Sequence, residues 1–140
     1  MGSHWLWLCL VVISRRGASQ RDVDMPFLLL YIGEGQKFDQ SLVTACLKEL
    51  RGATQYSSPD YLSAYLFEKG PDSTTICLKK DQETIVIDGE GEASLSAALH
   101  IQADYPEDIR LIDECYNFNI LLRGIASWQE LERRIKESGG

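Results

Sequence analysis

The feature that most constrains the fold is an uninterrupted apolar run, Phe27–Ile32 (FLLLYI), which ends at Gly33. A strand with one face in water alternates apolar and polar residues, whereas this run offers no polar face. The run is also shorter than a typical core helix. We therefore expect Phe27–Ile32 to be a central strand of a sheet, buried on both faces.

A helix is expected directly after this strand. Asp39 is a favourable N-cap residue, and Phe38 and Val43 have the spacing of a hydrophobic staple. The apolar stripe at helical spacing comprises Leu42, Val43, Cys46, Leu47 and Leu50. Gly52 follows as a stop signal, so the helix should end before it.

Two further helices are expected in the second half of the chain. One spans 93–104 and ends where Pro106 disfavours helical backbone in the residue before it. The other begins with a capping box in which Ser127 and Glu130 stand three positions apart. Its core positions would be Trp128, Leu131 and Ile135.

Short strands separated by turns lie between these helices. Tyr61–Phe67, Thr74–Lys79 and Glu83–Asp88 predict an antiparallel meander. Its apolar residues alternate with polar ones, which predicts one face in water. Residues 107–122 predict one or two strands with a bulge or bend around 113–115. The fold class expected is α+β, with a mixed, mostly antiparallel sheet of about five strands and three helices packed on it.

Residues 25–140 are expected to form this single domain, and residues 1–24 to be an upstream or vector-derived segment before Met25. Trp5–Ile13 (WLWLCLVVI) is too short for a membrane span, and its arginines follow the apolar run rather than precede it as in a signal peptide. We therefore expect a cytoplasmic protein without a membrane anchor. Two alternatives stay open for Trp5–Ile13: an extra strand of the sheet, or a self-association contact.

Cofactor and metal motifs fail at named positions. Gly33-Glu34-Gly35 lacks the third glycine of a dinucleotide loop, because Phe38 occupies that place. Residues 88–92 alternate carboxylates with glycines but lack the other ligands of a calcium loop, so we interpret them as the turn into a helix. Cys9, Cys46, Cys77 and Cys115 are widely spaced, which predicts buried, reduced thiols rather than a metal or redox site. No cofactor and no metal is expected.

The charge of the chain favours a protein partner over nucleic acid. The net charge is −7, and the residues after Asp24 carry −8, because three arginines and two aspartates precede Met25. Such a charge disfavours direct binding to nucleic acid or anionic lipid. The densest group of carboxylates falls within eleven positions and comprises Asp104, Glu107, Asp108, Asp113 and Glu114. We predict that these five residues bind a basic protein partner.

The acidic composition, the opening strand and the tail from Asp104 to Ile135 (DYPEDIRLIDECYNFNILLRGIASWQELERRI) resemble bacterial immunity proteins of polymorphic toxins. The contact-dependent growth-inhibition immunity proteins are the nearest group. The resemblance implies a cytosolic antitoxin that binds and neutralises a toxin domain, often a nuclease. It assigns no role to any single residue.

An alternative of a different class is a small carboxylate-dependent enzyme or ligand-binding domain. It would use His100 with at least two acidic residues, in a pocket walled by aromatic residues such as Tyr61 or Tyr65. The sequence shows no nucleophile or second ligand near His100 at useful spacing. We therefore expect no catalytic residues and favour the binding protein.

Overall fold

The computed structural model describes residues 27–139. The expectations for residues 1–24, including an extra strand at Trp5–Ile13, lie outside this range. The elements in chain order are β1 (Phe27–Tyr31), α3 (Gln40–Lys48), β2 (Ala53–Tyr56), β3 (Tyr61–Lys69), β4 (Asp72–Lys79), β5 (Ile85–Asp88), α4 (Glu92–Asp104), β6 (Arg110–Asp113), β7 (Asn119–Leu121) and α5 (Trp128–Gly139).

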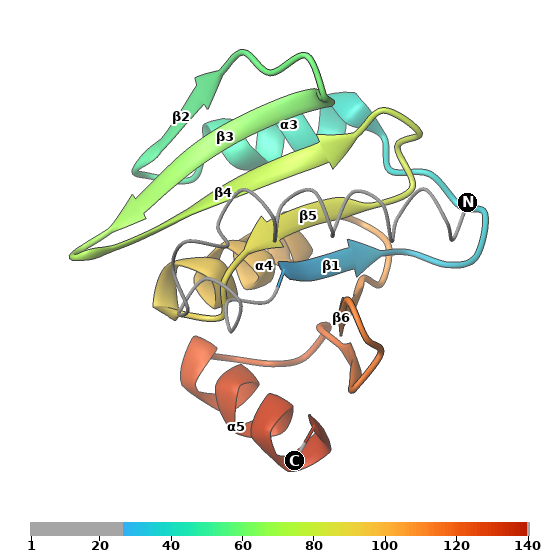
Figure 1. The fold of residues 1–140 in the computed structure, drawn as a ribbon, viewed down its shortest axis with the longest axis vertical. Coiled ribbons are helices and arrows are strands. Elements are labelled where there is room, and N and C mark those ends of the chain that lie inside the picture. Colours follow the sequence, from blue (N-terminus) through green and yellow to red (C-terminus); the bar gives the residue numbers. More distant parts are fainter. Residues whose placement is uncertain (1–26, 140) are drawn as a thin grey trace, which may run out of the picture.

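The strands form one antiparallel sheet in the order β2-β3-β4-β5-β1-β6-β7 (Figure 1). The α+β class and the three helices are confirmed. The sheet has seven strands rather than about five, and its described pairs are all antiparallel. β2 escaped prediction because three of its four residues are exposed and give no apolar pattern. Residues 107–122 form two strands because the chain reverses direction between β6 and β7.

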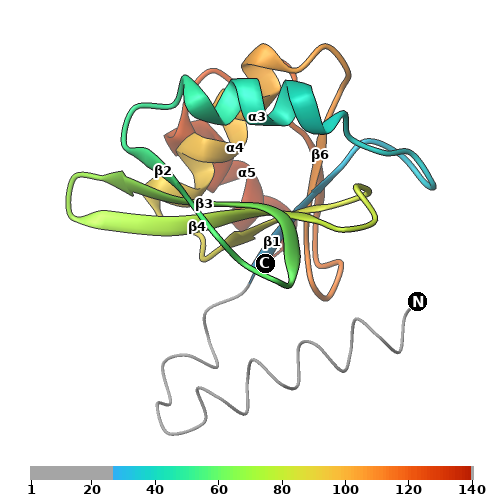
Figure 2. The same ribbon diagram turned by 90° about the horizontal axis from the view of Figure 1, so that it is seen from above.

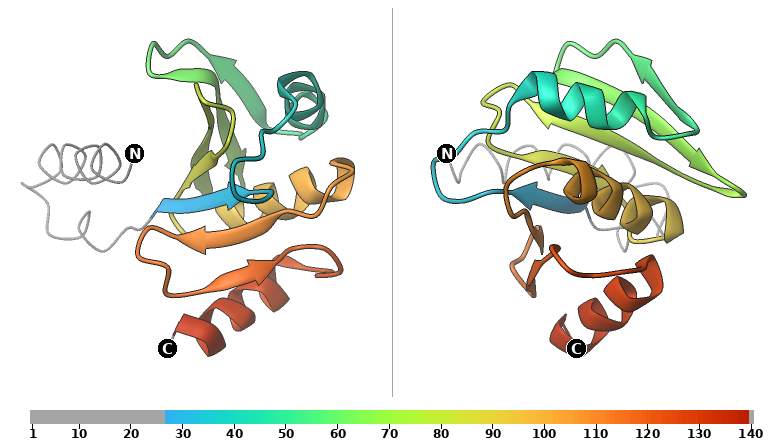
Figure 3. Two further views of the ribbon diagram at one scale, coloured as in Figure 1. Left: turned by 90° about the vertical axis from the view of Figure 1, so that its right-hand side faces the viewer. Right: turned by 180° about the vertical axis from the view of Figure 1, so that it is seen from behind.

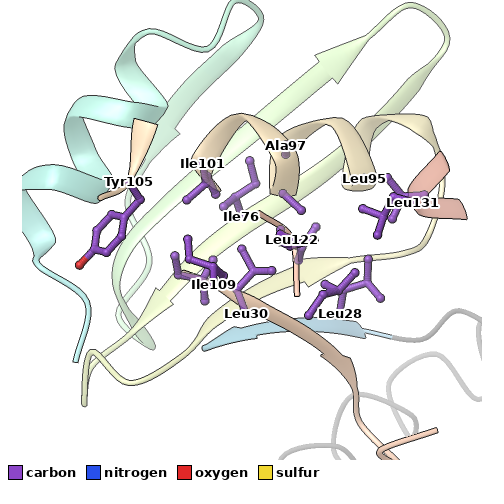
Figure 4. Packing of buried hydrophobic residues seen from close by; sticks show 14 of the residues in the cluster. Leu28, Leu30, Ile76, Leu95, Ala97, Ile101, Tyr105, Ile109, Leu122 and Leu131 are labelled. Atoms are coloured by element: carbon purple, nitrogen blue, oxygen red, sulfur yellow. The ribbon is translucent and has the colours of Figure 1, made fainter. Parts of the chain in front are cut away.

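The described helices lie on one side of the sheet (Figure 2). α3 packs beside β2, α4 crosses the middle of the sheet over β3, β4 and β5, and α5 covers the end at β7 (Figure 3). We call this side the inner face and the opposite side the outer face. The main core fills the space between the inner face and the helices (Figure 4).

β1 is the central strand that its sequence predicts. It pairs with β5 on one side and β6 on the other. Leu28 and Leu30 point into the main core, whereas Leu29 belongs to a separate apolar cluster on the outer face. All three side chains are buried. The absence of any polar position in FLLLYI is therefore explained by burial on both faces.

The outer face of the meander is exposed only in part: Leu66, Glu68 and Ser73 face water there, as predicted. The inner-face residues Ile76, Leu78, Ile85 and Ile87 are buried as expected. On the outer face, however, Cys77 is only 4% exposed and Val86 only 7%. The prediction failed in this central part because Phe27, Tyr31 and Tyr61 pack against the outer-face cluster that contains Leu29 and Val86.

The expected helix ends are confirmed. Asp39 caps α3 by accepting hydrogen bonds from the amides of Ser41 (2.9 Å) and Leu42 (3.2 Å). Phe38 and Val43 are both buried, as a staple requires. Leu42 is a correction, because this residue of the predicted stripe is 40% exposed.

The segment 88–92 is the predicted turn into a helix. Gly91 is the N-cap of α4 but has no side chain, and Asp72 at the start of β4 takes over by accepting a hydrogen bond from Ala93 N (2.9 Å). A Cβ atom at Gly91 would lie 2.5 Å from that carboxylate. A side chain at Gly91 would therefore displace the capping carboxylate of Asp72.

We expect Leu30→Ala to lower the free energy of unfolding by about 2–5 kcal/mol, because it leaves a cavity between the central strand and the helices. Leu42→Ala removes the same atoms from an exposed helix position and should cost under about 1 kcal/mol. Urea denaturation followed by circular dichroism measures both. Equal losses in the two variants would contradict the packing described for β1.

Candidate functional site

Three of the five carboxylates predicted to bind a partner lie together in the connection between α4 and β6. Asp104 is the last residue of α4, and Glu107 and Asp108 follow in the short segment before β6. All three side chains are exposed. We call residues 104–108 the acidic turn.

A buried glutamine, Gln102, supports the backbone of the acidic turn through hydrogen bonds. Gln102 is only 3% exposed, and its side chain forms hydrogen bonds with backbone groups within the turn and directly after it. Its Nε2 donates to the Glu107 carbonyl (2.9 Å), and its Oε1 accepts from the Ile109 amide (2.6 Å). The carboxylates that follow Gln102 therefore stand on a backbone with a fixed path.

Two residues outside the turn, Arg123 and Asp39, also form hydrogen bonds with it. Arg123, beyond β7, donates through Nε to Asp108 Oδ1 (2.9 Å) and through Nη2 to the Tyr105 carbonyl (3.1 Å). The buried Tyr105 accepts a hydrogen bond on its hydroxyl from Asp39 N (2.8 Å), which links the turn to the start of α3. The turn is consequently anchored from α3, α4 and the C-terminal segment.

The charges of the acidic turn are only partly compensated. Asp108 pairs with Arg123, and Asp104 Oδ2 lies 3.6 Å from His100 Nε2. Glu107 forms no ion pair with another residue of the 27–139 range. Exposed ion pairs contribute only about 0–1 kcal/mol, so a cationic partner can compete for these carboxylates.

The other two predicted residues lie at the far end of β6: Asp113 is its last residue and Glu114 directly follows it. Asp113 is 7% exposed and accepts hydrogen bonds from Asn117 N (2.7 Å) and Asn117 Nδ2 (2.8 Å), which shape the reversal into β7. Glu114 Oε1 accepts from Phe27 N (3.0 Å) at the start of the central strand. The five residues therefore fall into two groups, and only the three in the acidic turn are exposed.

Another acidic residue near Asp113 has a perturbed pKa. Burial raises the pKa of Glu90 above its ordinary value, and the nearby charges of Asp113 and Glu132 raise it further. The negatively charged form of Glu90 is therefore disfavoured in the folded protein.

A hollow of about 380 Å³ opens beside the β2–β3 connection. Its lining is mainly hydroxyl and aromatic and comprises Gln55, Tyr56, Ser57, Ser58, Tyr61, Leu62, Ser63 and Ala64. Tyr61 is one of the aromatic walls named for the enzyme alternative, but neither His100 nor a carboxylate lines this hollow. His100 instead donates from Nε2 to the Cys46 carbonyl of α3 (2.9 Å), which gives it a place in helix packing.

The cysteines of the described part do not share one environment. Cys46 and Cys77 are buried, as predicted, and burial raises the pKa of Cys46 to about 11, helped by the charges of Asp104 and Glu49. Cys115 is a correction, because it is exposed in the reversal between β6 and β7. Cys9 lies outside the described residues.

Within residues 27–139, no group of three or more His, Cys, Asp or Glu side chains is placed to hold a metal ion. No helix in this range is long and apolar enough to cross a membrane.

Sequence reasoning missed Gln102 and Arg123, the residues that shape the acidic turn. A weak signal existed for Gln102, because Leu95, Ala98 and Gln102 have helical spacing, which places the amide on the buried side of α4. A polar residue on such a stripe needs buried hydrogen-bond partners. Arg123 gave no signal, because its partners are brought near only by the β6–β7 reversal.

Comparison with known proteins adds no family assignment. The chain matches no protein-family model, no curated protein and no solved structure. The resemblance to immunity proteins, and the binding role of the five carboxylates, stay predictions.

Gln102→Met should lower the free energy of unfolding by about 1–3 kcal/mol, because the Ile109 amide loses its acceptor while the volume is kept. Hydrogen exchange of that amide should also become faster. Gln129→Met, at an exposed position of α5, is the matched control and should change neither quantity. Unchanged exchange at Ile109 would show that Gln102 does not hold the turn.

Glu90→Gln should raise the free energy of unfolding at about pH 7. Since the folded state holds the Glu90 proton more tightly than the unfolded chain, stability from this group is lost as the pH rises through its raised pKa. The difference between the two proteins should vanish at about pH 3, where glutamate is protonated in both states. Denaturation curves at the two pH values test this, with Glu34→Gln at an exposed position as control.

Proposed function

We propose that this chain is a non-catalytic binding protein that neutralises a bacterial toxin domain by covering the active site of that domain with an acidic surface. The observation that carries the proposal is the acidic turn: three exposed carboxylates on a backbone pinned by Gln102 and Arg123. The proposal places the protein in the cytoplasm, where a toxin domain such as a nuclease would act.

The physical basis is charge complementarity. A nuclease binds phosphates with lysine and arginine side chains, and these same groups are attracted to carboxylates. Oppositely charged surfaces raise the association rate and favour one orientation of the partners. A turn with a fixed backbone helps further, since fewer groups need to be ordered on binding.

The resemblance of the 104–135 tail to immunity proteins supports the same proposal. That tail contains the acidic turn, the β6–β7 reversal and most of α5. The hollow at β2–β3 lacks His100 and carboxylates, so it does not provide the site that the enzyme alternative requires. The binding protein is therefore the function that the geometry supports best.

The direct test uses the protein encoded by the adjacent gene. We expect this chain to copurify with the toxin-like domain of that protein and to restore growth of cells that express it. Asp104→Asn/Glu107→Gln/Asp108→Asn should slow association about tenfold or more at low salt, because the steering charges are removed. Stopped-flow or surface plasmon resonance measures the rate.

The matched control neutralises three exposed carboxylates elsewhere, Glu34→Gln/Asp60→Asn/Glu68→Gln, with the same change in net charge. It should leave the association rate nearly unchanged. Equal effects of the two triple variants would mean that net charge alone steers binding and that the acidic turn is not the contact. If the chain neither copurifies with the toxin-like domain nor restores growth, the proposed function is wrong.

A further inference from the structure

The two edges of the sheet differ in how their backbone is protected. β7, at one edge, is three residues long and packs against α5. At the other edge, no described element pairs with β2 on the side away from β3 (Figure 1). Proteins often block a free edge with charged residues, proline or a bulge. β2 has none of these three, because Ala53–Tyr56 contains no charged residue and no proline and pairs with β3 without a register shift.

The backbone of β2 directs hydrogen-bonding groups away from the sheet. Glu68 N donates to Gly52 O (3.1 Å), which makes these residues a hydrogen-bonded pair of the antiparallel ladder. Hydrogen-bonded and non-hydrogen-bonded pairs alternate along such a ladder. In the observed register, Thr54 and Tyr56 therefore bond to β3. Gln55 lies between them, so both its N–H and its C=O point away from β3.

The side chains of β2 leave this edge accessible to another strand. Thr54, Gln55 and Tyr56 are all exposed, and Tyr56 is 41% exposed although it is a large aromatic residue. Beside Thr54 on the outer face lies its register partner Leu66, which is 39% exposed. An exposed, uncharged edge strand with β-favouring residues is a template for pairing with another chain.

Charge favours a second copy of this chain as the pairing partner. The domain carries −8, but residues 48–60, which contain β2, have no net charge because two basic and two acidic residues cancel. Two copies therefore meet little local repulsion at this edge, whereas a basic partner is attracted to the acidic residues elsewhere. Arg51 and Asp60 flank β2 and are exposed, and neither forms an ion pair within residues 27–139.

We propose that two copies of this chain form a dimer by antiparallel pairing of their β2 strands about a two-fold axis at Gln55. In this register Gln55 N of each copy donates to Gln55 O of the other. On the outer face, Thr54 lies opposite Tyr56 of the second copy, which is a stabilising β-branched–aromatic pair. Arg51 of each copy is brought toward Asp60 of the other, and the two-fold axis repeats every contact.

The pairing of two four-residue strands is short, so the dimer should be weak and its population should depend on protein concentration. The inference is separate from the proposed function, because β2 shares no residue with the acidic turn. A monomeric protein would leave the role of the acidic turn unaffected.

Sedimentation velocity of the full chain over a range of concentrations tests the pairing. We expect the mean mass to rise from that of a monomer toward that of a dimer. Gln55→Lys places two like charges opposite each other and should raise the dissociation constant about fivefold. Gln55→Glu should do the same. An equimolar mixture of the two variants should restore dimerisation at least to the parent level, because opposite charges then meet across the axis.

Gln129→Lys, at an exposed glutamine of α5, is the matched control for the added charge and should leave the dissociation constant unchanged. Gln55 is exposed and its backbone does not bond to β3, so an unchanged circular dichroism spectrum verifies the fold of each variant. A parent protein that stays monomeric up to about 1 mM would overturn the proposal. A dimer that is equally stable in Gln55→Lys, or a mixture that does not recover, would also overturn it, because self-association would then use another surface.

Discussion

β1 is buried on both faces, and this burial decides which elements must surround the strand. The strand takes hydrogen-bonding neighbours on each side, so β5 and β6, which lie far apart in sequence, must be brought to it. Leu28 and Leu30 require the helices as a covering layer, and Leu29 requires apolar neighbours on the other side. Most of the topology follows from satisfying these demands of one five-residue strand.

The acidic turn depends indirectly on the way the other elements surround β1. α4 lies over the middle of the sheet, and the chain must return from its end to β6, which pairs with β1. The return is made at Tyr105 and Pro106, and the polar backbone that this sharp change exposes is satisfied by Gln102 and Arg123. Carboxylates on the turn cost little folding free energy, since their side chains remain in water. An ordered acidic surface is therefore compatible with the core requirements of the fold.

The two groups of predicted site residues show that residue type alone does not tell whether a carboxylate is exposed or has a structural role. Asp104, Glu107 and Asp108 are exposed, as an acidic docking surface requires. Asp113 and Glu114 have the same chemistry, yet they orient the β6–β7 reversal and the start of β1. Proximity in sequence could not distinguish the two groups of carboxylates. The acidic turn precedes β6, whereas Asp113 and Glu114 lie at the far end of this strand.

Features that depend on local spacing could be predicted from the amino-acid sequence. These include the buried central strand, the capped helix after Asp39, the capping box at Ser127, the meander and the α+β class. Tertiary packing sets the place of β1 between β5 and β6, the pairing of the exposed strand β2, and the burial of Cys77 and Val86 on the outer face. The physical reason is that periodicity reports which side chains share one face of one element. The neighbours of that face, including the partners of Gln102 and Arg123, are fixed only when distant segments pack together.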